Sequence, residues 1–226
     1  MIVHAIPGFS EPFSSMSHLF SSPVFLVLGV IMLWKLRGNT NRTISLSIFS
    51  FAVVFLLAMS GVFHLLTPGT TGRYVLQVLD HAAIFVLIAA TFTPIHALQF
   101  KGILRWGILA LVWTIAITGL TLESVFFQEV PEILSLILYL GLGWVGIISA
   151  YVLIRQFGVK AVLPLIYGAL AYTIGATLEF MRVPVLINGV IGPHEIFHLL
   201  VLAGISFHWQ FVYRMAQLHR ATFNVS

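Results

Sequence analysis

The stretch PHEIFH, residues 193–198, opens the last long apolar run of the chain. Its two histidines, His194 and His198, are four residues apart and therefore lie on one face of a helix. That spacing lets both imidazoles reach a single metal ion. A catalytic zinc ion commonly has three protein ligands and one water, so the pair predicts a third ligand and a carboxylate elsewhere in the chain.

The composition predicts an integral membrane protein. Of the 226 residues, 59% are hydrophobic and only 8% are charged, whereas a soluble domain carries roughly a quarter charged residues. Seven apolar runs reach or approach the roughly 20 residues that cross a bilayer. We therefore predict an all-α fold, a single seven-transmembrane-helix bundle over residues 1–226, with residues 1–20 at the interface. The expected helices cover residues 22–36, 43–66, 74–97, 103–122, 132–154, 160–181 and 194–215.

The charged residues predict the orientation of the chain. The formal net charge of +4 does not indicate nucleic acid, because the basic residues stand at the ends of apolar runs, where they meet lipid headgroups. Apart from Arg73 and Arg182, all lysines and arginines fall on one side of the predicted bundle. Because basic residues favour the cytoplasmic side, we predict the N-terminus outside and the C-terminus in the cytoplasm. The N-terminus has no basic region typical of a removable signal peptide.

Polar residues inside the apolar runs are candidates for function, because ionisable groups are costly in a membrane. Ser60 and His64 stand near the end of the second run, and Asp80 stands near the start of the third. In seven alternating spans, both positions and the start of the seventh span lie on the same side. Each residue alone would be interpreted as interfacial or hydrogen-bonded. Together, His64, Asp80, His194 and His198 favour a metal site, and with no cysteine in the chain only histidine and carboxylate ligands remain.

The other ionisable residues near these motifs have simpler interpretations. His81 points about 100° away from Asp80 on a helix, so we expect it to support a ligand rather than to be one. Glu195 completes a His-Glu-x-x-His pattern, which supplies two ligands and a general base in zinc metalloproteases. Intramembrane metalloproteases take their aspartate ligand from a later helix, whereas Asp80 comes far earlier, so we expect Glu195 to cap its helix. Interfacial or hydrogen-bonded roles are expected for His4, His18, His96, His208 and His219.

Several motifs together resemble the hemolysin III branch of the progestin and adiponectin receptor family of seven-helix membrane proteins. The resemblance spans nearly the whole chain. One position departs from the family pattern: Glu179 stands where an aromatic residue is expected, and we interpret it as interfacial, with gating or proton handling as the alternative. The motifs are IPGFSEP at residues 6–12, Ser60-x-x-x-His64, Asp80, TFTP at residues 91–94, and His194-x-x-x-His198.

The resemblance implies a zinc ion (Zn²⁺) bound by His64, His194 and His198. It also implies that Asp80 contacts the zinc-bound water and that Ser60 lies beside the site. Eukaryotic relatives are linked to ceramidase-like amide hydrolysis, and the wider superfamily includes alkaline ceramidases. A bacterial member would lie in the inner (plasma) membrane.

These expectations lead to two hypotheses from different classes. The first is a zinc-dependent integral-membrane hydrolase of acyl-amide or ester lipids, with Asp80 as general base, Ser60 stabilising the oxyanion, and a role in membrane homeostasis. Membrane lipids are the expected substrates or ligands, and nucleic acid is not an expected partner. The second is a non-enzymatic sensor or regulator of membrane state with a structural zinc. A pore-forming haemolysin and an intramembrane metalloprotease rank lower.

Overall fold

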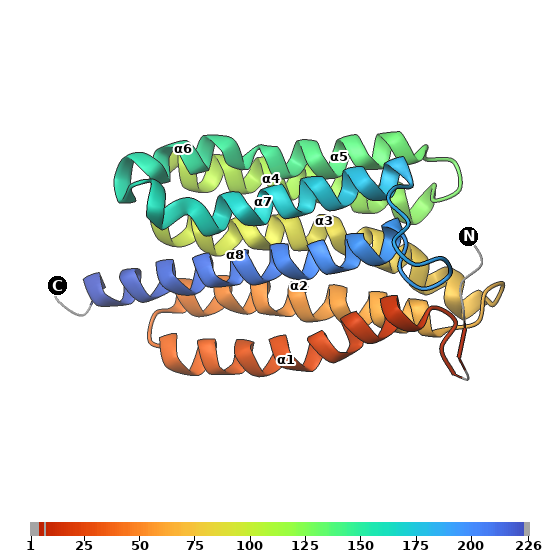
Figure 1. The fold of residues 1–226 in the computed structure, drawn as a ribbon. Helices are drawn as coiled ribbons and strands as arrows, with labels where there is room; N and C mark the ends of the chain where they lie inside the picture. The colour runs from red at the N-terminus through yellow and green to blue at the C-terminus, as the bar shows by residue number, and fades with distance from the viewer. Residues whose placement is uncertain (1–4, 7, 224–226) are drawn as a thin grey trace.

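The fold is known from a computed structural model that describes residues 5–6 and 8–223. Within these residues, seven helices are long and apolar enough to cross a membrane, as predicted, and the protein is an integral membrane protein (Figure 1). Helices α5 and α6 together form one of these spans. The helices are α1 (Pro12–Leu36), α2 (Thr40–Leu65), α3 (Thr71–Gln99), α4 (Gly102–Val125), α5 (Glu132–Trp144), α6 (Gly146–Phe157), α7 (Val159–Met181) and α8 (Pro193–Phe223).

Helix α1 begins at Pro12, well before the predicted first span, so part of the segment expected at the interface is helical. Pro12 suits the first turn, where a helix leaves backbone N–H groups unpaired. The polar side chains of this part are buried against other helices: Ser15 donates a hydrogen bond to the Gly61 carbonyl at 2.8 Å, and His18 is 2% exposed. Hydropathy missed the start of α1 because these polar groups are sheltered by tertiary contacts.

The fifth span is interrupted near its middle. Val145 separates α5 from α6, and the helix tightens there: the Ile148 N–H bonds the Val145 carbonyl three residues back, at 3.3 Å. Gly141, Gly143 and Gly146 surround the interruption. Glycine is about 1 kcal/mol less favourable than alanine inside a helix, so the sequence weakens the helix at this position.

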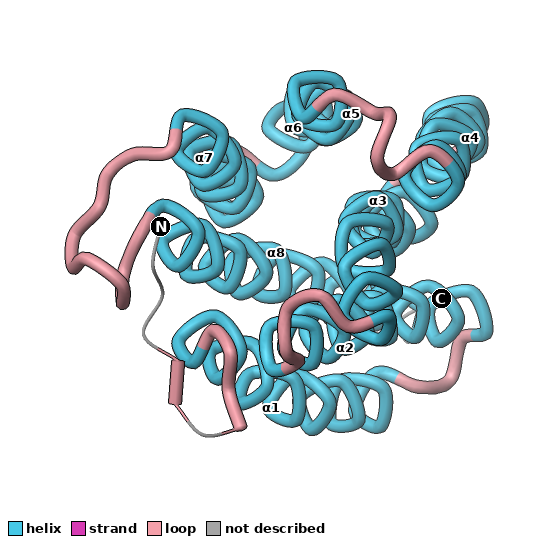
Figure 2. The backbone as a smooth tube through the Cα atoms, turned by 90° about the vertical axis from the view of Figure 1, so that its right-hand side faces the viewer, coloured by secondary structure: helices cyan, strands magenta, loops and turns pink. Residues whose placement is uncertain are grey.

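The helices form three tiers when the bundle is viewed along its length (Figure 2). Helices α1 and α2 lie on one side, α3 and α8 in the middle, and α4–α7 on the other side. The main apolar core joins α1, α2, α3 and α8, with Met32, Leu57 and Ile205 among its fully buried members. A cavity of about 770 Å³ reaches between the middle tier and α5–α7.

At Gly61, α2 packs tightly against α1. A Cβ atom added there would lie 2.7 Å from Cγ of Leu19 and 2.9 Å from the Leu19 backbone nitrogen, which cannot move aside without shifting α1. We expect Gly61→Ala to cost roughly 1–3 kcal/mol, as overpacking commonly does, and to lower the melting temperature in detergent. Gly72→Ala is the control, because its Cβ would meet only Cδ1 of Leu66, at 3.6 Å. Equal melting temperatures for the two variants would contradict the close contact.

Candidate metal centre

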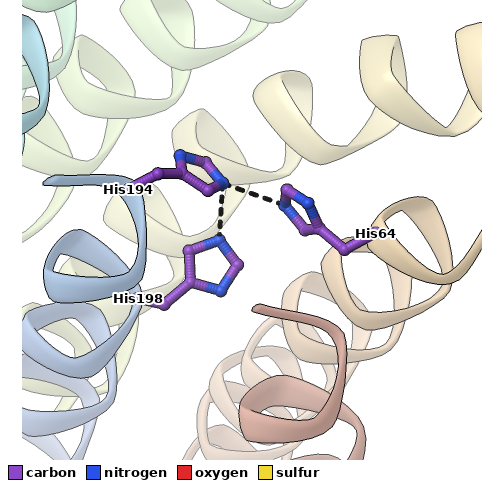
Figure 3. A group of neighbouring side chains, drawn as sticks. All are labelled: His64, His194 and His198. Atoms are coloured by element: carbon purple, nitrogen blue, oxygen red, sulfur yellow. Dashed lines mark hydrogen bonds between the residues drawn. The ribbon is translucent and has the colours of Figure 1, made fainter. Parts of the chain in front are cut away.

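Three histidines from two helices meet at one end of the bundle (Figure 3). His64 lies in the last turn of α2, and His194 and His198 lie in the first turns of α8. Nε2 of His194 is 3.1 Å from Nε2 of His64 and 3.1 Å from Nε2 of His198. One ligand atom from each residue lies within 4.8 Å of the others, so the three side chains can hold a metal ion.

The convergence follows from the direction of the helices. Helix α2 ends and α8 begins at the same end of the bundle, so the C-terminal turn of one faces the N-terminal turns of the other. His198 and His64 are 1% and 2% exposed, whereas His194 is half-buried. The centre therefore lies inside the helix bundle, with His194 at its more open side.

The carboxylates next to two of the rings suit a cation at the centre of the three histidines. Nδ1 of His64 hydrogen-bonds the Glu11 carboxylate, and Nδ1 of His194 is 3.4 Å from Oε1 of Glu179. A neutral ring that donates from Nδ1 to an ionised carboxylate has its lone pair on Nε2. Two such lone pairs 3.1 Å apart repel each other unless a proton or a metal ion lies between them. Ligands held tetrahedrally at roughly 2.05 Å from zinc lie about 3.3 Å apart, so the spacing fits as well.

Glu11 is a site residue that the sequence analysis missed, although it stands in the IPGFSEP segment. Its Oε1 lies 2.8 Å from Nη2 of Arg73, and its side chain is 24% exposed. Burial raises the pKa of Glu11, but the contacts with His64 and Arg73 outweigh burial and hold the pKa at about 2. The carboxylate is therefore ionised at neutral pH. One signal in the sequence could have indicated its role. Glu11 is followed by Ser15 and His18 at intervals of four and three residues, which places the three polar side chains on one helical face.

Glu179 also turns toward the centre, which differs from the interfacial interpretation. Its carboxylate contacts Nδ1 of His194 and forms an ion pair with Arg182. Its Oε2 is buried without a hydrogen-bond partner among the described residues. The departure from the family pattern therefore places a carboxylate against a candidate ligand.

Asp80 and Ser60 line the same cavity as His194 and His198. The Asp80 carboxylate is half-buried and interacts electrostatically with His64 and His194, but it is outside the group of converging ligand atoms. Ser60 is 2% exposed, one helical turn before His64. Both residues thus line the space next to the centre, and their catalytic roles stay predictions.

Glu195 caps α8, as expected. Its Oε2 accepts the Gly192 backbone N–H at 2.8 Å, and its Oε1 accepts the Ser14 hydroxyl at 3.0 Å. With both oxygens bonded in this way, Glu195 ties the start of α8 to α1. His81 bonds the Gln77 carbonyl of its own helix at 2.9 Å, and its ring packs against Phe127. Within the described part of the chain it makes no hydrogen bond to the three histidines, so it does not support a ligand directly.

Among the described histidines for which an interfacial or hydrogen-bonded role was expected, His18 is the exception. Its ring stacks on His198 with centroids 4.0 Å apart. Both of its nitrogens are buried without a hydrogen-bond partner among the described residues. The other described histidines of this group are hydrogen-bonded, as expected. His96 bonds the Leu104 carbonyl at 2.6 Å and Ser149 at 2.9 Å, His208 bonds the Leu165 carbonyl at 3.2 Å, and His219 lies 3.5 Å from Arg42. His4 is outside the described residues.

The cavity next to the centre is predominantly apolar and has a polar end. Asp80, Glu179 and His194 stand at that end, together with Glu123 of α4, a buried carboxylate that accepts the Ser135 hydroxyl. Sequence reasoning missed Glu123 because it placed this residue in a loop after the fourth span. The arrangement combines a candidate metal centre with space for an apolar molecule.

Comparisons with known proteins agree with this architecture. A sequence model of the haemolysin-III related family matches residues 9–209. The chain belongs to this family. The Hemolysin-3 homolog of Bacillus subtilis (strain 168) is 31% identical over 168 residues, which cover 74% of this chain and 75% of the relative. Hemolysin-3 of Bacillus cereus is 27% identical over 186 residues, which cover 82% and 80% of the two chains. The family match includes all three histidines of the centre and also Glu11 and Glu179.

Proposed function

We propose that this haemolysin-III family member is a zinc-dependent hydrolase of acyl-amide or ester lipids. One observation carries the proposal: three histidine nitrogens converge in a membrane protein, and two of the three histidines, His194 and His198, line a large apolar cavity. Histidine nitrogens suit zinc, and the chain has no thiolate to select a softer metal. Three protein ligands match catalytic zinc sites, which keep a fourth position open.

The chemistry requires a proton acceptor and an oxyanion stabiliser next to the metal. Zinc acts as a Lewis acid and makes water nucleophilic near neutral pH. The Asp80 carboxylate accepts the proton of the attacking water and returns it to the leaving amine or alcohol. The Ser60 hydroxyl donates a hydrogen bond to the oxygen that becomes negative on the acyl carbon. Both residues line the cavity beside the histidines, which supports these roles.

The cavity supports a lipid as substrate. Its volume of about 770 Å³ is within the range of roughly 300–1,000 Å³ of small-molecule sites. An apolar wall holds an acyl chain, and the polar end receives the amide or ester group. A lipid reaches such a site from the bilayer without crossing water. By the positive-inside rule, the centre would lie near the outer face of the plasma membrane.

Metal removal tests the proposal. The full chain, reconstituted in lipid vesicles, is assayed against N-acyl amide and acyl ester lipids before and after treatment with a strong chelator. We expect hydrolysis to fall to background after chelation and to return when zinc is added, but not when magnesium is added, because magnesium prefers oxygen ligands. Hydrolysis that persists in metal-free protein would overturn the proposal. Zinc bound without hydrolysis of any tested lipid would favour the sensor hypothesis.

A further inference from the structure

Two of the three candidate ligands share an arrangement that the third lacks. On each, the ring nitrogen that faces away from the centre meets a carboxylate, and that carboxylate meets an arginine. The two sets come from different parts of the chain, so one local sequence motif does not explain both. His64 is paired with Glu11 and Arg73, and His194 with Glu179 and Arg182.

The first set fastens the N-terminal segment to α2. Glu11 bonds Nδ1 of His64 through its side chain, and its backbone N–H bonds the His64 carbonyl at 3.0 Å. Arg73 holds the other carboxylate oxygen and also donates to the Leu66 carbonyl at 2.6 Å. Its guanidinium lies 4.6 Å over the Phe63 ring, and the side chain is only 12% exposed. Glu11 is thus fixed from two sides, and it fixes His64 in turn.

The second set joins α7 to α8 at the mouth of the cavity. Glu179 contacts both His194 and Arg182, and Nη2 of Arg182 lies 2.9 Å from each oxygen of Glu132 on α5. Arg182 and Glu132 are exposed, at 58% and 70%, so water weakens their pair. Glu179, at 23%, is better sheltered, and it is the member that contacts the histidine.

We propose that Glu11 and Glu179 are positioning residues that hold His64 and His194 ready to bind metal. Glu11 hydrogen-bonds Nδ1 of His64, and Glu179 lies 3.4 Å from Nδ1 of His194. A carboxylate at Nδ1 favours the tautomer with its lone pair on Nε2 and aims that lone pair at the centre. Carboxylates behind metal-binding histidines raise the basicity of the ligand and fix its ring. The inference rests on the metal centre of the proposed function, but not on its hydrolytic activity.

His198 provides the contrast. Its Nδ1 is buried without a hydrogen-bond partner among the described residues, and its ring stacks on His18. Packing therefore orients this ring instead of a carboxylate. The affinity of the centre for metal should depend on Glu11 and Glu179 because each contacts Nδ1 of a ligand ring, a contact that His198 lacks.

The experiment measures zinc affinity directly. Full-length wild type, Glu11→Gln, Glu179→Gln and Glu132→Gln are purified in detergent, stripped of metal and titrated with zinc against a competing chelator. Glutamine keeps the size of the side chain and removes its charge. We expect zinc affinity to fall about 10–100-fold in Glu11→Gln and in Glu179→Gln. Glu132→Gln is the matched control, because it removes a carboxylate from the same network without touching a histidine.

The melting temperature of each metal-free variant separates positioning from folding. The proposal expects both metal-free variants to remain folded and to bind zinc more weakly, with Glu179→Gln melting near metal-free wild type and Glu11→Gln melting lower because its ion pair with Arg73 is lost. Wild-type affinity in both variants, or an equal loss in Glu132→Gln, would overturn it. Wild type that binds no zinc would overturn both this inference and the proposed function. Wild type that binds zinc but hydrolyses no lipid would overturn only the proposed function.

Discussion

His198→Ala is expected to abolish stoichiometric metal binding. Purified wild type should carry about one zinc ion per chain, since three imidazoles and one open position form a single tetrahedral site. Removing His198 leaves two ligands, one of them half-buried and open to competing water. We expect the metal content of the variant, measured by mass spectrometry after chelator-free purification, to fall to a small fraction of one ion per chain.

His208→Ala is the matched control for this experiment. His208 is also a buried histidine of α8, but its Nε2 bonds the Leu165 carbonyl at 3.2 Å and it lies outside the converging group. Its loss should leave the metal content unchanged. Absence of metal from wild type as well would mean that the three histidines serve only packing and hydrogen bonding, and the hydrolase proposal would then be dropped.

Asp80→Asn is expected to reduce lipid hydrolysis about 10²–10⁴-fold, the usual effect of removing a general base. Asparagine has nearly the same shape but does not accept a proton from water. Because Asp80 lies outside the converging ligand atoms, zinc content should stay near the wild-type value. Rates are measured with saturating substrate in vesicles, and metal content is measured on the same preparations. Glu129→Gln, at an exposed position on the same side of the bundle, is the control.

Three outcomes would change the assignment of Asp80. An unchanged rate would rule out the proposed general base. A parallel loss of zinc and activity would make Asp80 a ligand instead of a proton acceptor. If wild type binds zinc and hydrolyses none of the lipids, while Asp80→Asn alters only the melting temperature, the structural zinc of the sensor hypothesis would explain both results.

The sequence by itself predicted the seven spans and placed His64, Asp80, His194 and His198 on one side of the bundle, and the family resemblance then implied that the three histidines are the ligands. The number of spans can be counted from the sequence, because a bilayer of fixed thickness requires an apolar run of roughly 20 residues for each crossing. The common depth of His64, His194 and His198 follows from alternation, because successive spans reverse direction and bring the end of the second span and the start of the seventh to one side. The helical spacing of four residues places His194 and His198 on one face. These properties are local or follow from counting, so no knowledge of packing was needed.

The tertiary structure alone decided which residues stand behind the ligands. Glu11 meets His64 across 53 residues of sequence, and His18 stacks on a ring of the last helix. Glu179 had been interpreted as interfacial because its position near a helix end fits that role equally well. The start of α1 was missed for a related reason: hydropathy averages over a window, whereas burial of Ser15 and His18 depends on which helices pack around them. Helical spacing indicates which residues share a face but not which distant segment that face contacts, so only the packed bundle reveals these contacts.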